Sequence, residues 1–165
     1  MIARRSLPFA LAVALCAPVA ARAQDSGIPV GQKAPAAAVT TLDGKPANLS
    51  QYVGKGPVVL EFWATWCENC QELEPTMKAA QAKYGKQVRF VGVAVSASQT
   101  PNRVKLYLQK HGVTWDQVYD TNGAATDAYD VPATSYVVVL DRTGKVVYTG
   151  LGGKQDIEAA IKRAL

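Results

Sequence analysis

The sequence predicts an α/β fold in which helices flank a central mixed β-sheet. From residue 57 to residue 129, short apolar runs alternate with segments of helical composition. Such runs are typical of strands that are buried on both faces. A further apolar run at 136–140 is joined by a turn to the segment 145–149, and together they predict a hairpin. An amphipathic segment over 155–165 predicts a closing helix.

The first predicted elements precede residue 64. Residues 39–42 predict a short strand followed by a turn, and residues 48–52 predict one helical turn. Residues 57–63 form an apolar run broken only by Glu61, which predicts a strand buried on both faces.

A long helix is predicted next, over residues 68–84, where apolar residues recur at three- and four-residue steps. Pro75 lies inside this segment and predicts a kink, because it removes a hydrogen bond and crowds the preceding turn. Gly85 ends the helix, and residues 88–95 predict another buried strand.

A second helix is predicted from Thr100-Pro101 to Gly112. Thr is a favoured N-cap, Pro suits the first helical position, and Gly is favoured just past a helix end. Residues 113–119 then predict a short strand, and residues 124–129 predict a short helix.

The first 23 residues predict a secretory signal peptide that is cleaved. Arg4 and Arg5 give it a basic start, an apolar stretch follows, and Ala21-Arg22-Ala23 offers an A-x-A cleavage site. We therefore expect export to the periplasm, with a retained membrane anchor as the alternative. The mature chain would hold an extended lead-in over 24–35 and one domain over 36–165.

The charge of the chain argues against nucleic acid as a partner. The formal net charge is +5, but the signal contributes three Arg residues and no acid. The remaining 15 basic and 13 acidic residues leave a net charge of +2, which is small and scattered. Nothing in the mature part is apolar for long enough to span a membrane. We expect a monomer.

The most informative motif is Trp66-Cys67-Glu68-Asn69-Cys70, which joins the buried strand to the long helix. A Cys at a helix N-terminus is stabilised as a thiolate by the helix dipole and by unpaired N–H groups. A second Cys three positions later can close a small disulfide ring with it. The mature chain offers two Cys and one His, whereas a zinc site needs about four ligands. The motif therefore favours redox chemistry, without metal or cofactor, over a zinc site or a structural disulfide.

With this motif at a strand-to-helix junction, the chain resembles a thioredoxin-fold protein. It is especially similar to the exported TlpA/ResA-like thiol-disulfide oxidoreductases of the redoxin group. The motifs that carry the resemblance are Gly31-Gln32-Lys33-Ala34-Pro35, residues 62–67, Pro75 five residues after the second Cys, and the turn at 141–144. The resemblance covers residues 31–165, and residues 88–130 are similar to the strand-and-helix insert of this group.

The resemblance implies a thioredoxin-like fold with that insert and assigns roles to the motif. Cys67 would be the nucleophile and Cys70 the buried resolving Cys, while Trp66 would shape the exposed face beside the sulfur. Glu61 lies six residues before Cys67, where thioredoxins carry a buried Asp. Burial should raise the pKa of Glu61 by desolvation, so that it could accept a proton from Cys70. A solvated Glu61 at a sheet edge is the alternative.

One position departs from the resemblance. Thioredoxin-like proteins place a cis-Pro opposite the Cys pair, where its backbone pairs with substrate chains. Counting from Tyr129 and from Gly144 aligns this position with Ser135. A cis bond before Ser costs ~3 kcal/mol, so we predict a trans Thr134–Ser135 bond, and we expect Thr134 and Ser135 to contact substrate. The alternative is that Pro132 is the cis-Pro and that the next strand starts three residues earlier.

Charged residues near the motif complete the prediction. The carboxylate of Glu68, in the first helical turn, repels a nearby thiolate and predicts a relatively reducing Cys couple. Glu72 and Glu74 are expected on a solvated face, and Leu73 stands where the TlpA/ResA-like group often has Glu. His111 is expected to stabilise the end of its helix.

The expected function is the reduction of disulfides in target proteins, such as cytochrome c apoproteins, copper-site assembly proteins or mispaired secreted proteins. By resemblance, a membrane reductase of the cytochrome c maturation or disulfide-reduction pathways would supply the electrons. Two alternatives are a copper- or metal-handling module and a binding module whose disulfide is merely structural.

Overall fold

A computed structural model describes residues 27–165. The predicted signal peptide, at residues 1–23, lies outside the described residues. The elements follow in this order: β1 (Ala38–Thr41), β2 (Pro46–Asn48), the 3₁₀ turn η1 (Leu49–Gln51), β3 (Val58–Trp63), α1 (Glu68–Tyr84), β4 (Arg89–Val95), α2 (Pro101–His111), β5 (Asp116–Asp120), α3 (Ala124–Ala128), β6 (Tyr136–Leu140), β7 (Val146–Leu151) and α4 (Ile157–Lys162).

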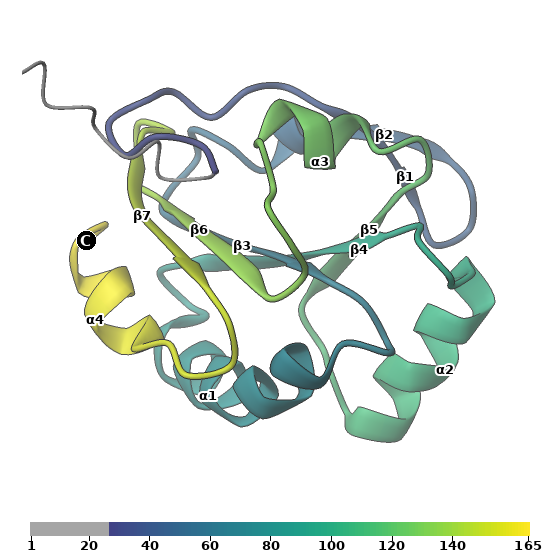
Figure 1. Cartoon of the computed structure of the whole chain (residues 1–165). Coiled ribbons are helices and arrows are strands. Elements are labelled where there is room, and N and C mark those ends of the chain that lie inside the picture. Colours follow the sequence, from purple (N-terminus) through teal and green to yellow (C-terminus); the bar gives the residue numbers. More distant parts are fainter. Residues whose placement is uncertain (1–26) are drawn as a thin grey trace, which may run out of the picture.

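The strands form one mixed sheet with the order β2-β1-β5-β4-β3-β6-β7. Strands β3, β4 and β5 are parallel neighbours, and the strands on either side of them are antiparallel. Figure 1 shows α3 on one face of the sheet and α1, α2 and α4 on the other. The predicted arrangement of a central mixed sheet flanked by helices is therefore confirmed.

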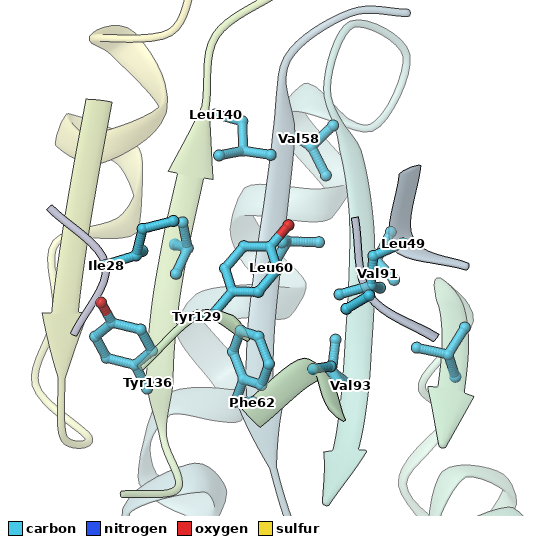
Figure 2. Close-up of a cluster of buried hydrophobic side chains, with 14 of the residues drawn as sticks. Ile28, Leu49, Val58, Leu60, Phe62, Val91, Val93, Tyr129, Tyr136 and Leu140 are labelled. Carbon is cyan, nitrogen blue, oxygen red and sulfur yellow. The ribbon is translucent and has the colours of Figure 1, made fainter. Parts of the chain in front are cut away.

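The side chains of β3 alternate between two cores. Leu60 and Phe62 face the α3 side, where the Tyr129 ring lies 5.3 Å from the Phe62 ring between centroids (Figure 2). Val59 points to the other face and packs with α1 and α4. Glu61 follows Leu60 and therefore also points toward the helices on that second face.

Most predicted elements agree with the structure. Helix α1 and strand β6 have the predicted bounds, and α2 carries the predicted caps, with the Thr100 side chain accepting from the N–H of Arg103 and Gly112 in the left-handed region. The short strand β2 was not predicted, because three residues that include a Pro carry no alternating pattern. Strand β5 begins three residues later than predicted, and α4 covers only the middle of its predicted segment.

The segment expected as an extended lead-in lies against the domain from Gly27 onward. The Ile28 side chain is buried beside Tyr136, and its N–H donates to the carbonyl of Tyr129 at 3.0 Å (Figure 2). The segment also pairs with the start of β7, because the N–H of Gly31 donates to the carbonyl of Val146. Within residues 27–165, every helix is too short or too polar to cross a bilayer.

Candidate active site

The two cysteines lie where strand β3 gives way to helix α1. Cys67 is the N-cap of α1, and its Sγ accepts a hydrogen bond from the N–H of Cys70 at 3.1 Å. Cys67 and Cys70 are joined by a disulfide, with 5.2 Å between their Cα atoms. An N-cap position directs unpaired N–H groups and the positive end of the dipole at the Cys67 sulfur. The local geometry is therefore that of a sulfur stabilised as a thiolate once the bridge is reduced.

The loop before Cys67 is held by the segment between β4 and α2. The buried side chain of Gln99 accepts the N–H of Thr65 at 2.9 Å and donates to the carbonyl of Val95. The indole N–H of Trp66 donates to the carbonyl of Ala97 at 2.8 Å. Sequence reasoning missed Gln99, because its partner lies 34 residues away.

Trp66 is the exposed part of the motif. Its side chain is 43% exposed, whereas both cysteines are buried in the disulfide state. An exposed aromatic ring beside a reactive sulfur offers an apolar surface to another chain.

The Glu61 side chain is buried on the face of β3 that is covered by α1 and α4. It pairs across the sheet with Gly92 of β4, and Gly92 pairs with Gln117 of β5. A side chain at Gly92 would push aside the amide of Gln117 from its present position. Trp63 fixes Gln117 further, because its indole N–H donates to Gln117 Oε1 at 3.0 Å.

Glu61 and Cys70 line the same small cavity, which has a volume of about 20 Å³. Its other polar walls come from Glu74 of α1, Tyr107 of α2 and Gln117 of β5. A cavity of this size holds about one water molecule. Glu61 and Cys70 therefore both border a space large enough for about one water molecule.

The environment of Glu61 keeps it protonated in the disulfide state. Burial raises its pKa by desolvation, and the carboxylate of Glu74 raises it further, from the ordinary 4.5 to about 8. Glu61 is 6% exposed, so the expectation of a buried acid is confirmed and the alternative of a solvated edge residue is wrong.

Glu74 does not belong to a solvated face, which corrects the expectation from sequence. Its side chain is 13% exposed and accepts hydrogen bonds from the Tyr107 hydroxyl at 2.8 Å and from Lys78 at 2.7 Å. The Nδ1 of His111 lies 3.1 Å from Glu74 Oε2, and the His111 ring stacks on Tyr107. Glu74 lies one helical turn after Cys70, and this spacing was the available signal that both share a face.

His111 and Glu72 each contact a residue outside the Cys motif. His111 is the last residue of α2, as expected, but its imidazole contacts Glu74 and lies apart from the redox sulfurs. Glu72 lies on the exposed side of α1 and pairs with Lys154 at 3.7 Å. The solvated face predicted for the two acids is therefore right for Glu72 alone.

Ser135 is buried in the loop before β6, and its polar groups all bond within the domain. Its N–H donates to the carbonyl of Phe62, its carbonyl accepts from the N–H of Gly152, and its Oγ donates to the carbonyl of Gly152. Ser135 has a φ of 64°, and residues 27–165 contain only trans peptide bonds. The predicted trans Thr134–Ser135 bond is confirmed, and the alternative of a cis bond before Pro132 is wrong. Thr134 beside it is half-buried.

The described part of the chain offers no ready metal centre. Between residues 27 and 165, no three His, Cys, Asp or Glu side chains are grouped so that they could hold an ion.

The sequence matches the Redoxin family over residues 29–165. The chain belongs to this family. The redoxin is 33% identical over 137 residues to the thiol-disulfide oxidoreductase ResA of Geobacillus kaustophilus, covering 82% of this chain and 78% of that protein. It is 30% identical over 138 residues to the thioredoxin-like protein YneN of Bacillus subtilis, covering 82% of this chain and 80% of that protein.

A solved structure agrees with these relatives. The redoxin superimposes on a Chlorobium tepidum protein described as the thiol:disulfide interchange protein DsbE, with a TM-score of 0.70 and 28% identity. The match covers 83% of this chain and 95% of that chain. The fold is therefore thioredoxin-like and the redoxin is ResA-like, as the sequence motifs predict. The relatives and the Cys67–Cys70 pair together support a thiol-disulfide oxidoreductase activity.

Proposed function

We propose that this redoxin reduces disulfides in target proteins, with Cys67 as the nucleophile and Cys70 as the resolving thiol. One observation carries the assignment: Cys67 is the N-cap of α1, whereas Cys70 lines a cavity with the buried acid Glu61. The helix end favours a thiolate at Cys67. The second sulfur has its own proton acceptor within the protein.

The exchange proceeds in two steps. The Cys67 thiolate attacks one sulfur of a target disulfide, so that a Cys67–target bond forms and the other target sulfur leaves as a thiolate. Cys70 then attacks the Sγ of Cys67, which releases the second target sulfur and closes the Cys67–Cys70 bridge. Two electrons pass to the target, and its two thiolates take their protons from water.

Glu61 handles the proton of Cys70 in both directions. As a carboxylate, it accepts the thiol proton when Cys70 becomes the attacking thiolate. It then holds this proton in the disulfide state, in keeping with its pKa of about 8. When a reductant opens the bridge at Cys67, Cys70 leaves as a thiolate and Glu61 returns the proton.

The target protein docks beside the exposed ring of Trp66. The indole is fixed by its bond to Ala97, so its apolar face is held beside Cys67. Thr134, in the loop before β6, provides the backbone of the substrate groove. Ser135 positions that loop, because its N–H and its side chain bind to Phe62 and Gly152.

The redoxin works in the periplasm, as a monomer, and receives electrons from a membrane reductase. The predicted signal peptide supports export, and the carboxylate of Glu68 in the first turn of α1 supports a reducing couple. Targets in cytochrome c maturation or related assembly are consistent with its similarity to ResA.

The order of attack is tested by trapping the mixed disulfide. Reduced Cys70→Ser protein, mixed with a disulfide-bonded test protein such as insulin, should accumulate a covalent complex that dithiothreitol releases. Cys67→Ser is the matched control and should trap little or none. Trapping by Cys67→Ser instead would reverse the two roles. Absence of trapping by either variant would support a merely structural disulfide.

A further inference from the structure

Glu74 and Glu61 are two acids that line the same small cavity. Glu61 reaches the cavity from β3 and Glu74 from α1. Two carboxyl groups that face one small cavity disfavour each other's ionisation. One of the two carboxyl groups is therefore expected to be charged and the other neutral.

The hydrogen bonds decide in favour of charge on Glu74. Lys78 forms an ion pair with Glu74 at 2.7 Å, and the Tyr107 hydroxyl donates to it at 2.8 Å. His111 adds a third contact at 3.1 Å. These partners hold the pKa of Glu74 below its usual range despite its partial burial.

Glu61 has no such support from the groups around its cavity. From α1 it faces Cys70 and the ionised Glu74, and from α2 it faces the Tyr107 hydroxyl. Burial and the nearby acids raise the pKa of that hydroxyl, so it stays neutral. Trp115 and Gln117, on the β5 side, are uncharged.

Resting on the function proposed above, we propose that Glu74 is a positioning residue that holds the proton on Glu61 while the Cys67–Cys70 bridge is closed. The charge of Glu74 acts through Glu61 and touches no substrate. A protonated Glu61 is what Cys70 needs when a reductant breaks the bridge and the sulfur leaves as a thiolate. Glu74 therefore widens the pH range in which the bridge is reduced with proton transfer from Glu61.

Substitutions of Glu74 and of its partner Lys78 should move the Glu61 titration in opposite directions. Removing the charge with Glu74→Gln should lower the pH at which Glu61 loses its proton, by about one pH unit. Removing the compensating cation with Lys78→Gln should raise that pH, because Glu74 then acts unopposed. Glu72→Gln is the matched control, since Glu72 lies two residues away on the exposed side of α1.

The experiment follows the Glu61 carboxyl carbon by NMR across pH 5–10 in the oxidised protein of each variant, with ¹³C-labelled Glu. Opposite shifts in Glu74→Gln and Lys78→Gln, with no shift in Glu72→Gln, would establish the proposal. Unfolding or general loosening would move both variants in the same direction. An unchanged Glu61 midpoint in Glu74→Gln would overturn the proposal.

A second readout separates this proposal from the function on which it rests. The rate at which dithiothreitol reduces the bridge is measured at several pH values in wild type and in Glu74→Gln. Each rate is divided by the rate for Glu61→Gln at the same pH, because this ratio cancels the titration of the reductant. In wild type this ratio should fall where Glu61 deprotonates, and in Glu74→Gln the fall should come at lower pH. A flat ratio in wild type would overturn the proton role of Glu61. A fall at the same pH in both proteins would overturn the role of Glu74 alone.

Discussion

The backbone N–H of Thr65 donates a hydrogen bond of 2.9 Å to the side-chain oxygen of Gln99, and this bond ties the redox loop to the segment after β4. The same Gln99 amide donates to the carbonyl of Val95 at the end of that strand. Because both partners are backbone groups, the amide fixes the path of the chain just before Cys67. The position of the reactive sulfur thus depends on a residue outside the Cys motif.

We predict that Gln99→Leu destabilises the protein and slows disulfide exchange. The substitution keeps most of the volume but leaves the buried N–H of Thr65 without its acceptor. An orphaned buried group costs roughly 1–3 kcal/mol, which chemical unfolding of the oxidised protein would measure. Gln109→Leu, on the exposed side of α2, is the matched control and should leave stability nearly unchanged. Equal stability of the two variants would contradict the role given to Gln99.

We predict that Glu61 makes the oxidised protein less stable as the pH rises. The pKa of Glu61 is about 8 in the folded state, against an ordinary value of 4.5. The folded state therefore binds more protons than the unfolded state between these values, so the free energy of unfolding falls with pH. This contribution is fully present below pH 4.5, and it is lost as the pH passes through about 8.

The measurement is urea unfolding at several pH values between 4 and 9. Glu61→Gln should lose this part of the pH dependence and be the more stable protein at the alkaline end. Glu68→Gln, at an exposed position in the first turn of α1, should keep the wild-type slope. Parallel curves for wild type and Glu61→Gln would show that Glu61 does not hold a proton in the folded state.

We predict that Trp66→Ala impairs reaction with protein disulfides more than reaction with small ones. The ring is 43% exposed beside Cys67, so its loss removes contact surface from a docked protein. The KM for a disulfide-bonded protein should rise several-fold, while the rate with a small disulfide such as oxidised dithiothreitol stays within about twofold of wild type. Equal losses with both substrates would indicate that Trp66 acts by holding the loop through Ala97.

We predict that Ser135→Pro destabilises the protein, whereas Ser135→Gly is tolerated. Proline fixes φ near −65°, but Ser135 has a φ of 64°, and proline would also remove the N–H that donates to Phe62. The expected loss for Ser135→Pro is about 3 kcal/mol or more. Glycine accepts positive φ readily and gives up only the Oγ bond to Gly152. Thermal unfolding measures both variants, and a higher melting temperature for Ser135→Pro than for Ser135→Gly would contradict this prediction.

The sequence predicted the Cys pair and the buried acid because both depend on local pattern. Cys67 and Cys70 are fixed by their spacing at a strand-to-helix junction, and Glu61 by its place in an apolar run. The buried strands from residue 57 onward and the hairpin were also predicted, from apolar runs and turn residues, whereas the order of the strands in the sheet was not. The parts that depended on periodicity and capping, such as α1 and α2, matched the structure at their ends.

The remaining parts of the site depend on contacts between distant segments, which local pattern does not encode. Gln99 contacts Thr65 across 34 residues, and His111 contacts Glu74 across 37. Glu72 and Glu74 have the same chemistry but lie on different sides of α1, and contacts with Tyr107 and His111 of α2 leave Glu74 the less exposed of the two. The helical spacing from Cys70 to Glu74 pointed to a shared face, but not to the partners that keep Glu74 ionised.

The most direct test of the proposed function is the equilibrium reduction potential of the Cys67–Cys70 couple, titrated against dithiothreitol or glutathione buffers. A reductive role predicts a reversible two-electron couple near or below thioredoxin's value of about −270 mV. A reversible couple above roughly −150 mV, toward the range of strong oxidants, would contradict it and indicate an oxidase or isomerase. A bridge that fails to titrate reversibly would contradict redox function of either kind.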